Sequence, residues 1–219
     1  MRPARTFHDL GGELGVAALA WRLPDAMPWR AVSTAFVGGG FTACNWVLNV
    51  QVPHGYARRD VGAHVDEVAR ALGLVGDGVG MLTAADVRKV RHAIDGEVTV
   101  EATVGLASPV WAAAPEEAEV HMSPGTVNIV AFMPVPHRDG ALANLLCTAT
   151  EAKVQALLDK GVPGTGTASD AVTVVCPGIT GRPEPELEPE PFGGPRSRFG
   201  AQLARATCSA ISAGAEGPR

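Results

Sequence analysis

The chain has 219 residues and a mass of 22.6 kDa, and 46% of its residues are hydrophobic while 19% are charged. This composition excludes disordered and fibrous proteins, and the length predicts a single domain over residues 1–219. A formal charge of -5 and a pI near 5.7 argue against nucleic acid as a partner, because general nucleic-acid binders are basic. No apolar run approaches the roughly 20 residues needed to cross a bilayer, and Asp9 and Glu13 interrupt any signal-peptide core. We therefore expect a soluble cytoplasmic protein that does not bind membranes, either alone or as a homo-oligomer.

The first part of the chain is expected to be rich in strands. Short segments of Val, Ala, Leu and aromatic residues predict strands at residues 14–22, 31–37 and 44–52. Apolar residues at helical spacing then predict a helix over 61–73. The sequence Thr83-Ala84-Ala85-Asp86 has capping-box spacing, with Asp in place of Glu, and predicts a short second helix.

The second part alternates strands with longer helices. Strict alternation predicts a strand over 97–106, and further strands are expected at 125–135 and 171–176. An apolar stripe at spacings of three and four predicts a helix over 139–160, and a last helix is expected at 197–213. The fold class predicted from this order is α+β, with mixed or antiparallel sheets covered by helices.

One segment is expected to lie outside the sheets and helices. Residues 182–191 alternate proline and glutamate, and proline removes the backbone donors that helices and inner strands need. We expect a solvated acidic loop there.

Two parts of the chain resemble one another at an offset of 83 to 84 residues, which suggests two pseudo-symmetric halves with a cleft between them. In each part an asparagine precedes the histidine of a Val-Pro-His sequence by nine residues, and a Gly-x-Gly turn with an aspartate follows. The matched residues are Asn45 with Asn128, His54 with His137, Gly78-Val79-Gly80 with Gly164-Thr165-Gly166, and Asp86 with Asp170.

Several known motifs are missing from the sequence. There is no P-loop, no Gly-x-Ser-x-Gly elbow and no His-Glu-x-x-His. The histidines have no partners at ligand spacing, so no metal site is predicted. The four cysteines Cys44, Cys147, Cys176 and Cys208 form no close pair, and their apolar neighbours predict buried free thiols.

A series of motifs resembles the adenosylcobinamide amidohydrolase family of corrinoid salvage. The series runs from Gly125-Thr126-Val127-Asn128 through Thr148-Ala149-Thr150-Glu151-Ala152-Lys153 to Thr165-Gly166-Thr167-Ala168-Ser169-Asp170. Further matches are Gly80–Ala85, Val104-Gly105-Leu106 and Gly194–Gly200. The resemblance spans about residue 8 to 213. Ala107-Ser108-Pro109 departs from it, since an asparagine is expected after the Gly-Leu, and so does His137.

The resemblance implies hydrolysis of the amide between the corrin ring's propionate side chain and its aminopropanol arm, giving adenosylcobyric acid. The corrinoid is then a small-molecule substrate, and no cofactor is implied. Two rival hypotheses are a non-catalytic corrinoid-binding carrier and an amidohydrolase for another substrate.

Amide hydrolysis needs a nucleophile, a proton donor for the amine and donors for the oxyanion. Asp170 is predicted as a general base for water, because it follows a turn of small residues that lets a substrate approach. Alternatively it caps that turn, and Thr165 or Thr167 supplies a hydroxyl nucleophile. Glu151 and Lys153 are further catalytic candidates, but they lie about 200° apart on the predicted helix and cannot act from one face.

The remaining candidates are predicted to bind substrate. Asn45, Asn49 and Asn128 are placed on apolar strands, where an unpaired amide is costly, so each either binds the amides of a corrin or bridges strands. Asp86 either shapes the opposite wall of the cleft or caps its own helix. Asn144 on the polar stripe of the 139–160 helix and His54 complete the predicted substrate-binding set.

Overall fold

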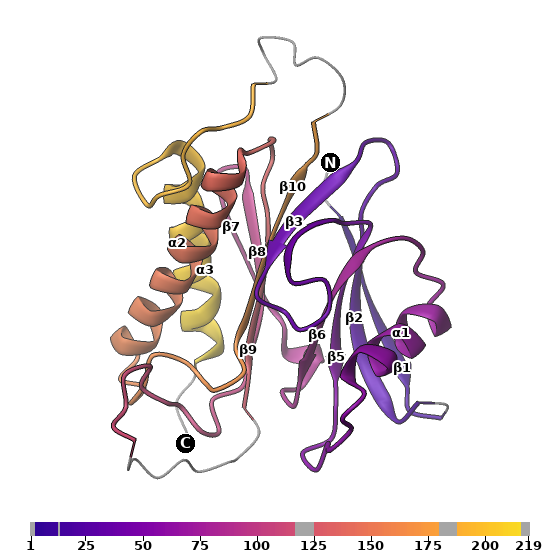
Figure 1. Cartoon of the computed structure of the whole chain (residues 1–219). Coiled ribbons are helices and arrows are strands. Elements are labelled where there is room, and N and C mark those ends of the chain that lie inside the picture. The colour runs from indigo at the N-terminus through magenta and orange to yellow at the C-terminus, as the bar shows by residue number, and fades with distance from the viewer. Residues whose placement is uncertain (1–2, 13, 117–124, 180–187, 216–219) are drawn as a thin grey trace.

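The computed structural model describes residues 3–12, 14–116, 125–179 and 188–215 (Figure 1). Its elements form four layers, in which helices α2 and α3 cover a six-stranded sheet, a four-stranded sheet packs on the other face, and helix α1 covers that second sheet (Figure 1). The predicted α+β class with mixed sheets is confirmed. No helix in the described part of the chain is long and apolar enough to span a membrane.

The four-stranded sheet has the order β1-β2-β5-β6. The β1–β2 and β2–β5 pairs are antiparallel, whereas β5 and β6 are parallel and are connected by helix α1. The bounds are β1 Ala4–Leu10, β2 Val16–Arg22, β5 Trp46–Gln51, α1 Val61–Ala71 and β6 Gly78–Thr83.

The six-stranded sheet has the order β4-β3-β10-β9-β8-β7. Strands β9 and β10 are parallel and joined by α2, and the remaining pairs are antiparallel. The bounds are β3 Trp29–Ser33, β4 Gly40–Ala43, β7 Arg91–Asp95, β8 Val98–Val104, β9 Val127–Phe132, α2 Asp139–Asp159, β10 Ala171–Pro177 and α3 Arg198–Gly214, with a 3₁₀ turn η1 at Val87–Lys89.

The core consists of three apolar layers, because both faces of both sheets are covered. Leu19, Trp21 and Met81 fill the space between the sheets, Leu142 and Phe199 pack between the larger sheet and its helices, and α1 packs on the smaller sheet. Strands buried on both faces carry continuous apolar runs, as β9 and β10 do. This rigid scaffold fixes the loops at its two ends.

The predicted pair of halves is visible in the topology. Strands β1, β2, β5 and β6 with α1 have the same order and directions as β7, β8, β9 and β10 with α2. The residue matching was wrong in part, however, because Gly78-Val79-Gly80 belongs to strand β6 and is not a turn. The aspartate that immediately precedes β6 is Asp77, so Asp77 and not Asp86 is the counterpart of Asp170.

Other sequence predictions differ from the structure locally. Strands β1, β4, β6 and β7 were not predicted. Thr83 ends β6 and accepts the Ala85 N–H at 3.0 Å, and Asp86 caps the 3₁₀ turn instead. Residues 182–187 of the predicted acidic loop lie outside the described residues, while Glu190 pairs with the chain at His137.

Candidate active site

Motif segments that are far apart in the sequence meet at one end of the two sheets. The amide of Asn128, at the start of β9, donates to the carbonyl of Leu82, at the end of β6, at 2.9 Å. A Cβ atom added at Gly105, which follows β8, would lie 3.1 Å from Ala85 and 3.2 Å from the Thr126 nitrogen. The segments 80–85, 104–106 and 125–128 therefore converge beside residues 164–170, which we call the Asp170 loop (Figure 1).

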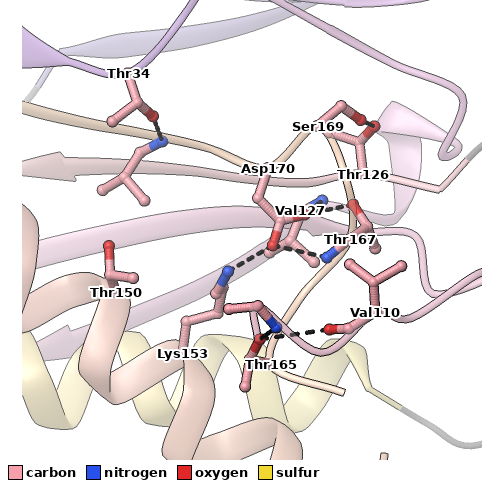
Figure 2. Close-up of polar contacts among 12 residues, drawn as sticks. Thr34, Val110, Thr126, Val127, Thr150, Lys153, Thr165, Thr167, Ser169 and Asp170 are labelled. Atoms are coloured by element: carbon pink, nitrogen blue, oxygen red, sulfur yellow. Dashed lines mark hydrogen bonds and ion pairs between the residues drawn. The ribbon is translucent and has the colours of Figure 1, made fainter. Parts of the chain in front are cut away.

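The carboxylate of Asp170 is the centre of this region and accepts four hydrogen bonds (Figure 2). Oδ1 accepts from the Val127 N–H at 2.9 Å and from the Thr167 hydroxyl at 2.5 Å. Oδ2 accepts from the Thr167 N–H at 3.1 Å and from Lys153 Nζ at 2.5 Å. Both oxygens are fully engaged, so the geometry favours proton exchange with Thr167 over direct activation of a water molecule.

Lys153 reaches this carboxylate from helix α2. Its side chain is only 8% exposed and that of Asp170 only 10%, so the two form an ion pair that is largely shielded from water. Glu151 is exposed on a different face of α2, which agrees with the predicted separation of these two residues around the helix. Thr150, one turn before Lys153, donates instead to the Leu146 carbonyl and does not join the cluster (Figure 2).

The lack of a side chain at Gly166 makes room for the ion pair between Lys153 and Asp170. A Cβ atom at this position would lie 2.2 Å from Asp170 Oδ2 and 2.5 Å from Lys153 Nζ. Real Cβ atoms do not approach other atoms so closely. A glycine here is therefore a requirement of the cluster and not only of the turn.

The two threonines of the Asp170 loop have different roles in the structure. The Thr165 hydroxyl accepts the Ala112 N–H at 2.9 Å and lies 3.4 Å from the Val110 carbonyl, so it fastens the loop to a neighbouring segment. The Thr167 hydroxyl instead faces Asp170, and its side chain is half-buried (Figure 2). Thr167 is therefore the hydroxyl that has a base beside it.

A second hydroxyl pair adjoins the cluster and was not predicted. Thr126 Oγ1 and Ser169 Oγ share a hydrogen bond of 2.7 Å, and Thr126 is 6% exposed. The two residues are 43 positions apart, and the only signal in the sequence was that both lie within the matched family motifs.

Asn49 and Asn128 are brought together between the sheets. Asn128 Nδ2 donates to Asn49 Oδ1 at 2.8 Å, and Asn49 Nδ2 donates to Thr103 at 3.0 Å. Both asparagines are 1% exposed, and Asn128 Oδ1 has no hydrogen-bond partner within the described structure. In this structure the pair bridges the two sheets, and Asn128 comes one residue after Val127, whose N–H binds Asp170.

The other predicted residues lie elsewhere. Asn45 precedes β5 and is exposed, with its N–H bonded to the Asp77 carbonyl, so it is neither on a strand nor near Asn128. Asp86 accepts from the backbone and side chain of Arg88, which lowers the pKa of that carboxyl. Asn144 lines a cavity at the start of α2, and His54 is exposed in the turn after β5.

The four cysteines are divided between the core and the surface. Cys44 and Cys176 are buried as predicted, but Cys147 is exposed because it lies on the outer face of α2, and Cys208 is half-buried. Among the described residues no three His, Cys, Asp or Glu side chains are grouped to hold a metal ion.

Comparison with known proteins identifies the family to which these motifs belong. The family model for adenosylcobinamide amidohydrolase matches residues 14–218. A protein of that name from Methanosarcina mazei is 30% identical over 86% of this chain and 90% of its own length. Another from Halobacterium salinarum is 32% identical over 95% of this chain and 85% of its own length. A crystal structure of a Pyrococcus horikoshii OT3 protein superposes with a TM-score of 0.47 at 12% identity, over 91% of this chain and 76% of the other.

Proposed function

Since this chain belongs to the adenosylcobinamide amidohydrolase family, we propose that it hydrolyses the amide that joins the corrin propionate side chain to the aminopropanol arm of adenosylcobinamide. Water is the second substrate, and the products are adenosylcobyric acid and aminopropanol. The acid then re-enters cobamide synthesis. The reaction needs no cofactor besides the corrinoid substrate itself, and it would take place in the cytoplasm.

The contact that carries the proposal is the 2.5 Å hydrogen bond between the Thr167 hydroxyl and Asp170. Thr167 Oγ1 attacks the amide carbonyl carbon, and its proton passes to Asp170. The departing amine takes up that proton as the C–N bond breaks, which leaves an ester on Thr167. In the ester Thr167 no longer donates to Asp170 Oδ1, so this oxygen can take a proton from the water molecule that attacks the ester carbonyl. Asp170 then passes that proton to Thr167 Oγ1 as the ester bond breaks, which releases the acid and restores the hydroxyl.

Lys153 and Val127 act as positioning residues in this scheme. The ammonium group of Lys153 and the Val127 N–H fix the two carboxylate oxygens, so that Asp170 faces Thr167 without having to reorient. Such preorganisation is a large part of how active sites lower barriers. In this scheme Thr167, and not a free water molecule, attacks the amide carbonyl, because both oxygens of Asp170 already accept hydrogen bonds from protein donors.

The first test is incubation with adenosylcobinamide followed by mass spectrometry for aminopropanol and adenosylcobyric acid. Release of both products supports the proposal. Binding of the corrinoid without release would indicate a carrier, and neither binding nor release would indicate another amide substrate.

The nucleophile is tested by a matched pair of variants. Thr167→Val should lower kcat by about 10⁴ or more, because loss of a covalent nucleophile costs up to about 10⁶ in rate, and Thr167→Ser should restore most of the rate. Thr165→Val removes an equivalent hydroxyl that only fastens the loop, so kcat should stay within about tenfold of wild type. Equal losses in both valine variants would exclude Thr167 as the nucleophile.

A further inference from the structure

Two large apolar side chains are exposed beside the Asp170 loop. Phe36 is 78% exposed and Trp111 is 50% exposed, whereas Trp21, Trp29 and Trp46 are at most 8% exposed. Single exposed apolar residues are common on protein surfaces, so exposure alone assigns them no role. What distinguishes these two is that the backbone beside Trp111 is hydrogen-bonded to the Asp170 loop, and the backbone beside Phe36 to strand β10, which begins where that loop ends.

The backbone on both sides of Trp111 is hydrogen-bonded to the Asp170 loop. Val110 donates its N–H to the Gly166 carbonyl at 2.8 Å and accepts the Thr165 N–H at 2.8 Å. On the other side, the Ala112 N–H donates to the Thr165 hydroxyl at 2.9 Å. Trp111 is therefore held in place beside the Asp170 loop, which carries the candidate nucleophile, while its indole ring remains half exposed.

Phe36 lies in a segment that is hydrogen-bonded to strands β10 and β6. Two residues before it, Thr34 exchanges hydrogen bonds of 3.0 Å with Val172, at the start of β10. One residue after it, the Val37 carbonyl accepts the Gly80 N–H of β6 at 3.1 Å. Thr34 and Val110 lie on opposite sides of Asp170 (Figure 2), so the segments that carry Phe36 and Trp111 flank the loop.

We propose that Phe36 and Trp111 form the contact surface for the corrin ring, an inference that rests on the proposed function. A corrin is a broad and largely apolar disc with amide arms at its rim, and it needs apolar surface on the protein beside a few polar groups. Aromatic side chains supply that surface at little entropic cost when their backbone is already fixed. Contact with the two rings would hold the disc across the Asp170 loop, where one amide arm reaches Thr167.

The chain offers a matched control at its other end. Phe192 is 71% exposed and lines a cavity of about 470 Å³ with Gly140, Asn144 and Arg196. Gly140 and Lys153 are separated by thirteen residues of α2, which is about 20 Å along the helix axis. Removal of the Phe192 ring is therefore expected to leave the corrinoid contacts unchanged.

The test compares Phe36→Ala, Trp111→Ala, Trp111→Phe and Phe192→Ala with wild type. Binding of adenosylcobinamide is measured by equilibrium dialysis using its visible absorption, and hydrolysis by steady-state kinetics. For Phe36→Ala and Trp111→Ala we expect Kd and KM to rise about tenfold, as for loss of a central aromatic contact, with kcat within about threefold of wild type. Trp111→Phe should recover most of the affinity, and Phe192→Ala should match wild type. Thermal melts establish that each variant is folded.

The outcomes separate this inference from the proposed function. If wild type hydrolyses adenosylcobinamide while Phe36→Ala and Trp111→Ala bind it as well as Phe192→Ala does, the contact surface is refuted and the activity stands. A wild-type protein that neither binds nor hydrolyses adenosylcobinamide refutes both. A fall in kcat without a change in Kd would also refute the contact surface.

Discussion

The ion pair between Lys153 and Asp170 predicts an asymmetry between two substitutions that each remove one charge. In Lys153→Met the carboxylate keeps three donors, namely the Val127 N–H and the N–H and hydroxyl of Thr167. In Asp170→Asn the ammonium of Lys153 loses the carboxylate that it contacts at 2.5 Å, in a site where its side chain is 8% exposed. The NH₂ group of the substituted side chain would also face other hydrogen-bond donors in either orientation, because each carboxylate oxygen accepts only from donors.

The expected magnitudes follow from this difference in partners. Leaving a buried charge unpaired costs about 3 to 5 kcal/mol of unfolding free energy, so Asp170→Asn should lose about 4 kcal/mol. Losing one charged hydrogen bond while the others remain costs about 2 kcal/mol, which is the value expected for Lys153→Met. An unfolding entropy of about 2.1 cal/mol/K per residue converts these losses into Tm decreases of about 9 °C and about 4 °C.

Urea unfolding followed by circular dichroism, together with calorimetric melts, measures both single variants and the double variant Lys153→Met/Asp170→Asn. The double variant should be more stable than Asp170→Asn alone, because it no longer contains an unpaired ammonium. If Lys153→Met is as damaging as Asp170→Asn, or if the two losses simply add, the described network of donors around Asp170 is wrong.

Two further predictions concern groups outside the candidate site. Burial raises the pKa of the Cys44 thiol to about 12 and that of Cys176 to about 11. In Ellman titrations at pH 8, Cys147 should therefore react fast, while Cys44 and Cys176 should react only after unfolding. Rapid reaction of all four thiols in the folded protein would contradict this. Burial also lowers the pKa of His137, so on acidification the unfolded chain takes up a proton before the folded chain does. The unfolding free energy should therefore fall as the pH drops below about 6.5. In urea unfolding measured from pH 7.5 to 5, His137→Asn should flatten this dependence, and an unchanged slope would exclude His137 as its source.

The predictions of the longest elements were accurate because their apolar periodicity continues for several turns or pairs. Helix α2 and strands β8, β9 and β10 were found within a few residues of their ends. Strand β6 was missed because Gly78 and Gly80 suggested a turn. In the structure these glycines make room for neighbours, since a Cβ atom would lie 2.1 Å from the Trp46 ring at Gly78 and 2.3 Å from Val65 at Gly80. Such a requirement is set by tertiary packing and cannot be recognised locally.

The candidate site was predictable in its residues but not in its contacts. Asp170, Thr167 and Lys153 were all named as candidates, yet the sequence did not indicate that Lys153 contacts Asp170. The sequence did indicate that Lys153 lies on the buried face of the helix, because it is four residues after Ala149 and four before Leu157, and both of these are buried. A lysine within the apolar stripe of a helix needs a buried partner. Which carboxylate provides it depends on the parallel β9–α2–β10 connection and not on local spacing.

The repeated topology explains why the cluster formed in the second half of the chain. Asp77 and Asp170 precede equivalent strands, but Asp77 is exposed whereas the Asp170 side chain is 10% exposed. Helix α1 carries no lysine, and its one arginine, Arg70, is exposed. Helix α2 instead places Lys153 on its buried face, against Asp170. The lysine of α2, together with the glycine at position 166, thus converts a common structural position into a shielded ion pair beside a threonine hydroxyl.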